Sequence, residues 1–398
     1  MSKLNELIQQ LCPDGVEFKP LGEVCILSRG KVYSKDYLKD NPGDFPVYSS
    51  QTANNGELGR INTYDCEGDY LTWTTDGAHA GTIFHRTGKF SITNVCGLIK
   101  IKESNLYIRF LYYWLSIKAK GYVNQGMGNP KLMTNQIEVI PIPLPPLPVQ
   151  EEIVRLLDQL TETAQKYQAE LEAELDVRKK QYEEYRNQLF SFDEFKLKVK
   201  LLKIEDIAKC YAGATPKTER KEYWDNGNIP WMSSGEVNLG QVYHTEKFIT
   251  QEGYDNSSTK MLPKDTVVIA LAGQGKTRGT VAITRIELCT NQSLCGIVLN
   301  NNEVNSDYLY YYLKGQYETL RKISSGDGTR GGLNLKMINN FEVPIPDLLE
   351  QERIVNILNR MDKTHKELCQ SIETEIKMRK QQYEYYRNRL LDFKKKEE

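Results

Sequence analysis

The feature that most constrains this chain is an internal repeat at a fixed offset. The segment RKKQYEEYRNQLFSF, which begins at Arg178, returns 201 residues later as RKQQYEYYRNRLLDF, which begins at Arg379. The same offset aligns QEEIV at 150–154 with QERIV at 351–355, and each of these follows a proline-rich run. Further upstream, NQIEVIPIP matches NNFEVPIP and FPVYSS matches IPWMSS with small insertions. A whole unit is therefore duplicated, and the sequence predicts two globular parts that each precede a similar tail.

Both tails have the pattern of a coiled-coil helix. Apolar or small residues recur at steps of three and four from Ile153 to Leu189, including Tyr182 and Tyr185, and again from Ile354 to Leu390. A helix of about 40 residues is roughly 60 Å long. One helix follows each globular part, so packing the two together makes them antiparallel around a pseudo-twofold axis. The predicted domains are a first head at 1–149, a spacer helix at 150–195, a second head at 196–346 and a second spacer helix at 347–398.

The heads have the pattern of mixed α/β (α+β) domains. In the second head, TVVIALA and GTVAIT are rich in β-branched residues and flank a glycine-rich loop. In the first head, YLTWTT and GTIFHR flank DGAHA in the same way. The segments NLYIRFLYYWLSIKAK and NSDYLYYYLKGQYETLRK predict core helices, because their aromatic residues recur at helical spacing.

Composition restricts the possible classes of protein. The first residues are too polar for a signal peptide, and no stretch offers the ~18 unbroken apolar residues of a membrane span, so we expect a cytoplasmic protein without membrane contact. The eight cysteines include no C-x-x-C pair and, with only four histidines, match no zinc spacing, so we expect reduced thiols and no metal. The formal net charge is −1, so any affinity for nucleic acid must come from local patches.

One segment imitates a nucleotide-binding loop. ALAGQGKT at 270–277 ends like a P-loop, but Ala270 stands where the first glycine belongs, and the following RGTVAIT predicts a strand where a P-loop needs a helix. A nucleotide-hydrolysing enzyme is therefore a weak alternative. The same loop could read DNA, since Lys and Arg address guanine and Gln addresses adenine, or it could be an ordinary exposed hairpin loop. We find no catalytic triad, paired carboxylates or metal cluster, and predict no catalytic residue.

Several of these segments resemble one family. AGATPKTERKEYWDNGNIPWMSSGEV at 212–237, GQGKTRGTVAI, and the two transitions PLPPLPVQEEIVRLL and PIP…QERIVNIL are similar to the specificity (S) subunit of type I restriction-modification systems. The resemblance covers essentially the whole chain. It implies two target-recognition domains, joined by an antiparallel helix pair that spaces two half-sites on double-stranded DNA and docks two modification subunits.

The resemblance also implies that the chain is not itself an enzyme and holds no cofactor. Modification subunits would bind S-adenosylmethionine and methylate adenine, and restriction subunits, where present, would add translocation and cleavage driven by ATP with Mg. Because the heads differ in sequence, the target should be asymmetric and bipartite, with half-site centres about one turn, roughly 34 to 36 Å, apart. A structural coiled-coil adaptor without DNA specificity is the alternative.

The candidate site residues follow from this resemblance. The repeated tyrosines would dock the partners, although sealing the helix pair is the competing interpretation. The acidic excess at 151–195 is interpreted as a solvated helix face rather than a docking surface. His79 could equally be a packed or solvated histidine, and Arg330 could clamp a phosphate. The candidate DNA contacts are Ser49, Ser50, Gln51, Asp76, His79, Lys131, Ser233, Ser234, Gln274, Lys276, Thr277, Arg278 and Arg330, and the candidate docking residues are Tyr182, Tyr185, Tyr383 and Tyr386.

Overall fold

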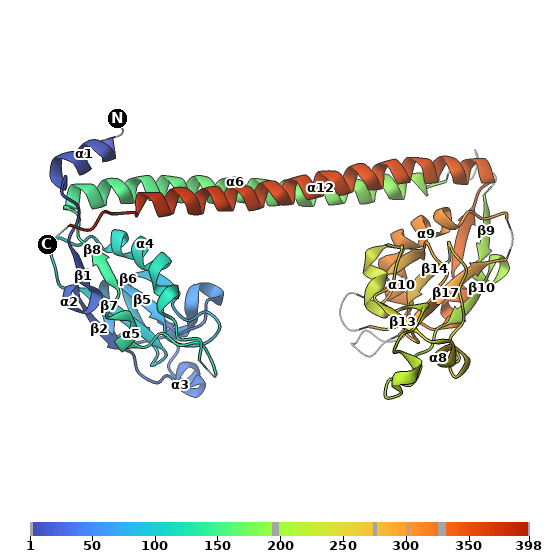
Figure 1. Ribbon diagram of the computed structural model, residues 1–398, viewed down its shortest axis with the longest axis horizontal. Coiled ribbons are helices and arrows are strands. Elements are labelled where there is room, and N and C mark those ends of the chain that lie inside the picture. The colour runs from blue at the N-terminus through green and yellow to red at the C-terminus, as the bar shows by residue number, and fades with distance from the viewer. Residues whose placement is uncertain are drawn as a thin grey trace. The chain divides into compact units, whose positions relative to one another are not determined.

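The computed structural model describes residues 3–126, 128–192, 199–273, 277–300, 302–324 and 332–396. The chain divides into two compact units, one formed by Met1–Leu171 with Thr374–Glu398 and the other by Glu172–Glu373. Each unit therefore contains one head together with one end of each long helix (Figure 1). The last residues of the chain therefore belong to the same compact unit as the first head.

The first head is built on a six-stranded sheet in the order β2-β7-β5-β6-β3-β4. Neighbouring strands are antiparallel except for β3 and β6, which are parallel. The hairpin of β5 and β6 confirms the two strands predicted around DGAHA, and its register runs from Cys66 opposite Phe90 to Trp73 opposite Ile83. The strands are β2 Cys25–Arg29, β3 Phe45–Tyr48, β4 Glu57–Ile61, β5 Cys66–Thr74, β6 Ile83–Ile92 and β7 Cys96–Ile101.

The core of this head lies between the sheet and helix α4 (Ile108–Lys118). Trp73 is fully buried, and its Nε1 donates a hydrogen bond to the Leu132 carbonyl at 3.0 Å. Phe110 and Leu115 of α4 are also fully buried, as the aromatic helical pattern predicted. The remaining elements are α1 Lys3–Leu11, β1 Phe18–Pro20 paired with β8 Pro141–Pro143, α2 Leu21–Val24, α3 Lys35–Asp40, the 3-10 turns η1 Ala53–Gly56 and η2 Ala119–Tyr122, and α5 Thr134–Ile137.

The second head repeats this plan with two sheets. A five-stranded sheet has the order β10-β17-β14-β15-β12, and a three-stranded sheet has the order β13-β11-β16. The predicted strands around the glycine-rich loop are confirmed as β14 (Val267–Ala270) and β15 (Val281–Thr284). The other strands are β9 Lys200–Lys203 paired with β18 Glu342–Ile345, β10 Ala208–Ala212, β11 Ile229–Met232, β12 Gln241–Val242, β13 Lys247–Ile249, β16 Cys289–Thr290 and β17 Leu294–Leu299.

Helix α9 (Ser306–Gly315) takes the place of α4 in this head, between the sheet and the long helices (Figure 1). Tyr308 and Tyr311 of α9 are fully buried, and the Tyr308 hydroxyl donates to the Pro344 carbonyl at 2.5 Å. The remaining helical elements are α7 Ile204–Ile207, η3 Lys221–Tyr223, η4 Ser234–Leu239, α8 Gln251–Asp255, α10 Tyr317–Ile323 and α11 Leu335–Asn339.

Two helices of 43 residues each follow the heads, α6 (Leu147–Leu189) and α12 (Leu348–Leu390). At 1.5 Å per residue each is about 65 Å long. In the first unit the beginning of α6 packs against the end of α12: Thr161 contacts Tyr383, and Tyr167 lies beside Arg379. The partner position falls as the α6 position rises, so the helices are antiparallel, as the repeat predicted.

A buried glutamine fastens each long helix to the head that precedes it. Gln150 is fully buried; its Nε2 donates to the Asn105 and Pro145 carbonyls at 2.7 Å each, and its Oε1 accepts from the Tyr107 amide at 2.8 Å. Gln351, at the equivalent place in the repeat, makes three equivalent bonds in the second unit. It donates to the Glu303 and Pro346 carbonyls and accepts from the Asn305 amide. These two residues open the QEEIV and QERIV segments, so the repeated motif encodes the junction between head and helix.

The residues that follow each long helix pack against the core of the head in the same unit. In the first unit, Leu391 is 4% exposed, and the Phe393 ring packs against Phe110 and Trp114 with centroid distances of 5.9 and 6.3 Å. In the second unit, the Phe190 ring packs against Tyr308 at 5.4 Å. The helices therefore end at Leu189 and Leu390, before the ends of the predicted spacer segments, because the chain turns there to bury these aromatic rings.

Candidate nucleic-acid interface

The first candidate reading element is the loop between β3 and β4. Its ends are joined by a hydrogen bond from the Ser49 amide to the Gly56 carbonyl at 2.9 Å. The Ser49 hydroxyl accepts from the Gln51 amide at 3.4 Å, and the Gln51 side chain donates to the Glu57 carbonyl. Ser50 is half-buried, while Gln51 is exposed. The structure thus brings Ser49 and Gln51 together in one closed loop, where their polar groups partly support the loop itself.

A second element is the turn between β5 and β6, which contains Asp76 and His79. Asp76 forms a backbone bridge with Lys131, so the structure joins two candidates that lie far apart in the sequence. Neighbouring bonds from the Gly77 amide to Pro130 at 3.0 Å and from the Leu132 amide to Thr75 at 2.8 Å extend this pairing. His79 and Lys131 are exposed. They are available to a ligand.

The same turn is supported by an arginine that sequence reasoning missed. Arg29, at the end of β2, donates from Nη2 to the Thr75 hydroxyl at 3.0 Å and to the Asn94 carbonyl at 2.5 Å. Beside it, Asp76 Oδ1 is buried without a hydrogen-bond partner among the described residues. The resemblance gave Asp76 as a reader, but no local pattern linked Arg29 to a turn 46 residues further along the chain.

In the second head, the loop between β14 and β15 carries four candidates, of which Gln274 and Lys276 lie outside the described residues, as does Arg330 elsewhere in this head. Among the described residues, the Gly279 amide donates to the Ala270 carbonyl at 2.9 Å, and a tight turn at 277–280 is closed by the Thr280 amide, which donates to the Thr277 carbonyl at 3.0 Å. Strand β15 follows this turn where a P-loop requires a helix, so the segment lacks the architecture of a nucleotide-binding loop.

The two described candidates of this loop differ in exposure. Thr277 is half-buried, whereas Arg278 is only 7% exposed and lies against α10, where Arg321 donates to the Arg278 carbonyl at 3.5 Å. A base contact by Arg278 would therefore require its guanidinium to move outward. The sequence could not indicate this burial, because α10 lies 40 residues further along the chain.

Ser233 and Ser234 lie at the start of turn η4. The Ser233 amide and hydroxyl both donate to the Glu236 carboxylate at 2.7 Å, and the Glu236 carboxylate also accepts from the Glu246 amide at 2.9 Å. Glu236 is 6% exposed, so these bonds form a buried capping box. Ser233 therefore supports the loop, and Ser234 is half-buried beside it.

Tyr182 lies in the seam of the helix pair in the second unit. Its side chain is 9% exposed, and its hydroxyl donates to the Asp362 carboxylate, which also accepts from Lys314 at 3.3 Å. The Tyr182 ring stacks on His365 at a centroid distance of 4.7 Å. Burial, together with the bond to Asp362, raises the pKa of Tyr182, so this hydroxyl stays protonated and donates.

Tyr383 has the equivalent position in the first unit, but a neutral partner. Its hydroxyl lies 3.1 Å from the Thr161 hydroxyl, and its ring is half-buried. Tyr182 and Tyr383 thus seal the helix pair. By contrast, Tyr185 and Tyr386 are 58% and 44% exposed, so their predicted placement in the seam is wrong.

Each of these exposed tyrosines follows an exposed apolar residue eight positions earlier on its helix. Val177 and Met378, which are also equivalent in the repeat, are 50% and 59% exposed. Each helix therefore presents the same pair of exposed apolar positions.

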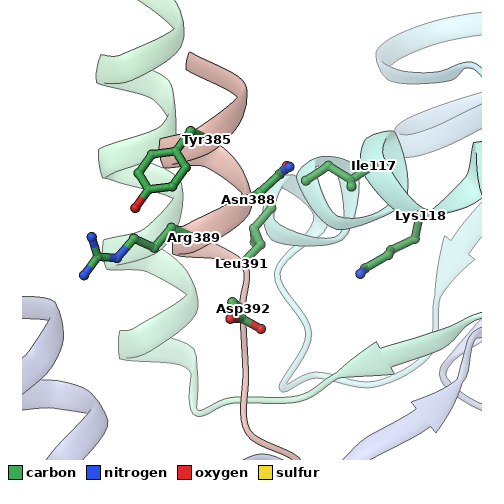
Figure 2. A pocket seen from close by; sticks show the side chains of 7 residues that line it. All are labelled: Ile117, Lys118, Tyr385, Asn388, Arg389, Leu391 and Asp392. Atoms are coloured by element: carbon green, nitrogen blue, oxygen red, sulfur yellow. The ribbon is translucent and has the colours of Figure 1, made fainter. Parts of the chain in front are cut away.

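A hollow of about 510 Å³ lies where the end of α12 meets the end of α4 in the first unit (Figure 2). Figure 2 shows Asn388 and Leu391 beside Ile117, while the charged ends of Arg389 and Lys118 lie apart. Both cations are lining residues, together with Asp392. The hollow is open to solvent and its lining carries both positive and negative side chains. It lies beside the buried Leu391, where the end of α12 meets the first head.

The described residues contain no group of three or more His, Cys, Asp or Glu side chains that could hold a metal ion. No helix in the described ranges is long and apolar enough to cross a membrane. The fold defines a two-headed protein in which one α/β plan is used twice with different loops, each head followed by a long helix.

Comparison with known proteins identifies the family to which this chain belongs. The family described as type I restriction modification DNA specificity domain matches residues 13–175 and 196–378, one match for each half of the repeat. The chain belongs to this family and is a DNA specificity subunit of a type I restriction-modification system. Specificity subunits are non-catalytic members of such systems.

Two relatives agree with this assignment. The chain is 33% identical over 374 residues to type I specificity subunit S.MpnORF507P of Mycoplasma pneumoniae, covering 93% of this chain and 96% of that protein. It is 32% identical over 302 residues to the EcoR124I/EcoR124II specificity subunit of Escherichia coli, covering 74% of this chain and 73% of that one.

Solved structures share the fold. A chain from work on complex assembly and conformational transition of the type I R-M system superposes with a TM-score of 0.76 at 16% identity, covering 94% of this chain and 97% of that chain. The HsdS subunit from Thermoanaerobacter tengcongensis gives a TM-score of 0.53 at 17% identity, with coverage of 94% and 96%. At these identities the likeness concerns the fold alone.

Proposed function

We propose that this specificity subunit reads an asymmetric, bipartite site on double-stranded DNA, with one half read by each head. The proposal rests on one observation: the two heads share the same fold, but their equivalent loops differ. After β3, the first head has a loop with exposed polar side chains, whereas after β11 the second head has the capped turn η4. Different donors and acceptors select different base edges, so the two half-sites should differ.

The helix pair would set the unread gap between the half-sites. Each helix is 43 residues, or about 65 Å, long, which is ample for half-site centres one turn, roughly 34 to 36 Å, apart. Because both ends of the pair are fastened to heads by Gln150 and Gln351, a change in helix length would be transmitted to the gap.

The equivalent surfaces on the helices would dock two modification subunits. Val177 with Tyr185, and Met378 with Tyr386, form equivalent exposed apolar pairs that could each contact one copy. In this proposal the modification subunits bind S-adenosylmethionine and methylate adenine. Restriction subunits, where present, add ATP with Mg, and the whole complex acts in the cytoplasm.

Selection from randomised DNA tests the reading function. The chain would be purified with its modification subunit and incubated with random double-stranded DNA, and the retained molecules would be sequenced. We expect two unlike blocks separated by a fixed gap. Two identical blocks would contradict the assignment of different half-sites to the heads, and retention without any motif would favour a coiled-coil adaptor.

A further inference from the structure

The first head buries an arginine that forms no direct ion pair. Arg86, on β6, is 3% exposed, and no carboxylate lies at ion-pair distance from it among the described residues; the Glu57 carboxylate acts on it from further away and pairs with Arg60. Its guanidinium carbon lies 3.6 Å from the centre of the Tyr48 ring and 4.4 Å from that of Phe84. Burial lowers the pKa of Arg86, but an arginine remains charged at neutral pH. A cation kept buried without a direct ion pair requires other stabilising contacts in its surroundings.

The hydrogen bonds of Arg86 lead to the loop after β3. Its Nη2 donates to the Asn55 carbonyl at 2.7 Å, and its Nε donates to the Thr72 hydroxyl at 3.3 Å. Gly56 packs directly on the guanidinium, because a Cβ atom there would lie 3.0 Å from Nη2. Arg86 therefore packs beneath the tip of the loop and supports its backbone.

The backbone at this tip is strained. Asn54 and Asn55 both have left-handed conformations, with φ of 49° and 52°, and Gly56 follows at φ 78°. Two successive left-handed residues other than glycine are unfavourable, and asparagine tolerates this region better than most residues. Such strain persists only where the surrounding structure imposes it, and it is concentrated at functional sites.

The strained conformation presents two amide side chains to solvent. Asn54 and Asn55 are exposed, and neither amide group has a hydrogen-bond partner among the described residues. An asparagine amide matches the N6 and N7 edge of adenine with two hydrogen bonds. Unlike Gln51, whose amide supports the loop, these two side chains remain available for a base.

We propose that the tip of this loop is an adenine-reading element of the first head, with Asn54 and Asn55 as base-contacting residues and Arg86 as their positioning residue. The inference rests on the proposed reading function and assigns it to particular atoms. The bond from Arg86 to the Asn55 carbonyl, together with the packing of its guanidinium under Gly56, fixes the direction of the two amides. Lysine cannot replace it, since an ammonium group lacks the planar fork that fits between two rings and a carbonyl.

The test uses the complete complex with its modification subunits. Binding would be measured on duplexes in which each adenine of the selected site is replaced, one at a time, by 7-deazaadenine, which lacks the N7 acceptor. We expect a loss of roughly 2- to 13-fold for at least one adenine, the range for losing one of the two hydrogen bonds of a bidentate contact. In the double variant Asn54→Gly with Asn55→Gly, which keeps the left-handed backbone accessible, the same replacement should have no effect.

A matched control comes from the second head. Asn226 is also exposed and left-handed, with φ of 60°, so the variant Asn226→Gly makes the same chemical change away from this loop. The complex with this variant should retain the sensitivity to 7-deazaadenine. If the double glycine variant also keeps full sensitivity at every adenine, the assignment is overturned. If the wild-type complex selects no site at all, the reading function itself fails.

The role of Arg86 requires a readout other than stability. In the variants Arg86→Met and Arg86→Lys, discrimination at the adenine read by the loop should fall, while discrimination at every position of the other half-site stays unchanged. A merely structural role would reduce binding at both half-sites together without relaxing any base preference. Equal discrimination in wild type and both variants would refute the positioning role.

Discussion

Replacing Gln351 by leucine should strongly destabilise the second unit. The glutamine is fully buried, accepts from the Asn305 amide at 2.8 Å and donates to the Glu303 and Pro346 carbonyls at 2.9 Å each. Leucine fills a similar volume but leaves one amide and two carbonyls without these partners. Each buried group left unsatisfied costs roughly 1 to 3 kcal/mol, and two of the three bonds are only partly buried, so we expect a net loss of about 2 to 4 kcal/mol.

Urea unfolding followed by circular dichroism would measure this loss. Hydrogen exchange at the Asn305 amide gives a local readout, since that amide loses its acceptor in the variant. The matched control is Gln382→Leu on the same helix, where the side chain is exposed and the change should be within about 0.5 kcal/mol. Gln150→Leu should cost a similar amount in the first unit. A loss below about 1 kcal/mol for both buried glutamines would refute the account of the junction.

Three further predictions concern the helix pair. Tyr182→Phe removes a bond to a carboxylate and should cost about 1.5 to 3 kcal/mol, whereas Tyr383→Phe removes a bond to a neutral hydroxyl and should cost about 0.5 to 1.5 kcal/mol; urea unfolding showing the reverse order would contradict the assigned partners. Burial lowers the folded-state pKa of His365, so its stabilising effect is present above pH about 6.5 and is lost as the pH falls through the folded-state pKa. Unfolding from pH 8 to 5 should therefore weaken wild type more than His365→Ala, and parallel profiles would disprove the effect. One heptad inserted into both helices adds about 10 Å, so the gap should lengthen by about three base pairs in the methylated motif, and an unchanged gap would refute the spacing role.

The architecture could be predicted because the sequence contains the same unit of head and helix twice. The fixed offset revealed the duplication, and the helical steps revealed both long helices without any knowledge of tertiary contacts. The buried glutamines at 150 and 351 also had a visible signal, since each opens the repeated motif after a proline-rich run. Local patterns and chain-length repeats are properties of the sequence itself, which is why these features were accessible.

The detailed seam could not be predicted from spacing. The next seam position after Tyr182 can lie three residues on, at Tyr185, or four residues on, at Arg186. The pattern favoured Tyr185 because it is the more hydrophobic of the two. The structure instead buries Arg186, which is 8% exposed, and leaves Tyr185 in solvent. Both positions fit a helical period, so the choice depends on contacts with the head of the same unit, where Arg186 packs beside Gly315.

The loops were the least predictable part, because distant residues decide their structure. Glu236 captures the Ser233 hydroxyl, α10 covers Arg278, and Arg86 supports a loop that precedes it by about 30 residues. Sequence resemblance could place candidate readers in these loops. It could not distinguish side chains that support a loop from those that it presents to a ligand.

Methylation mapping tests the central claim most directly. The chain would be co-expressed with the neighbouring gene for an adenine methyltransferase in a host without background adenine methylation, and modified adenines would be located by single-molecule sequencing. The account predicts one split, asymmetric motif with a fixed gap, which disappears when this chain is omitted. A methylated motif that is unchanged without this chain, or a soluble complex that methylates no defined motif, would contradict it.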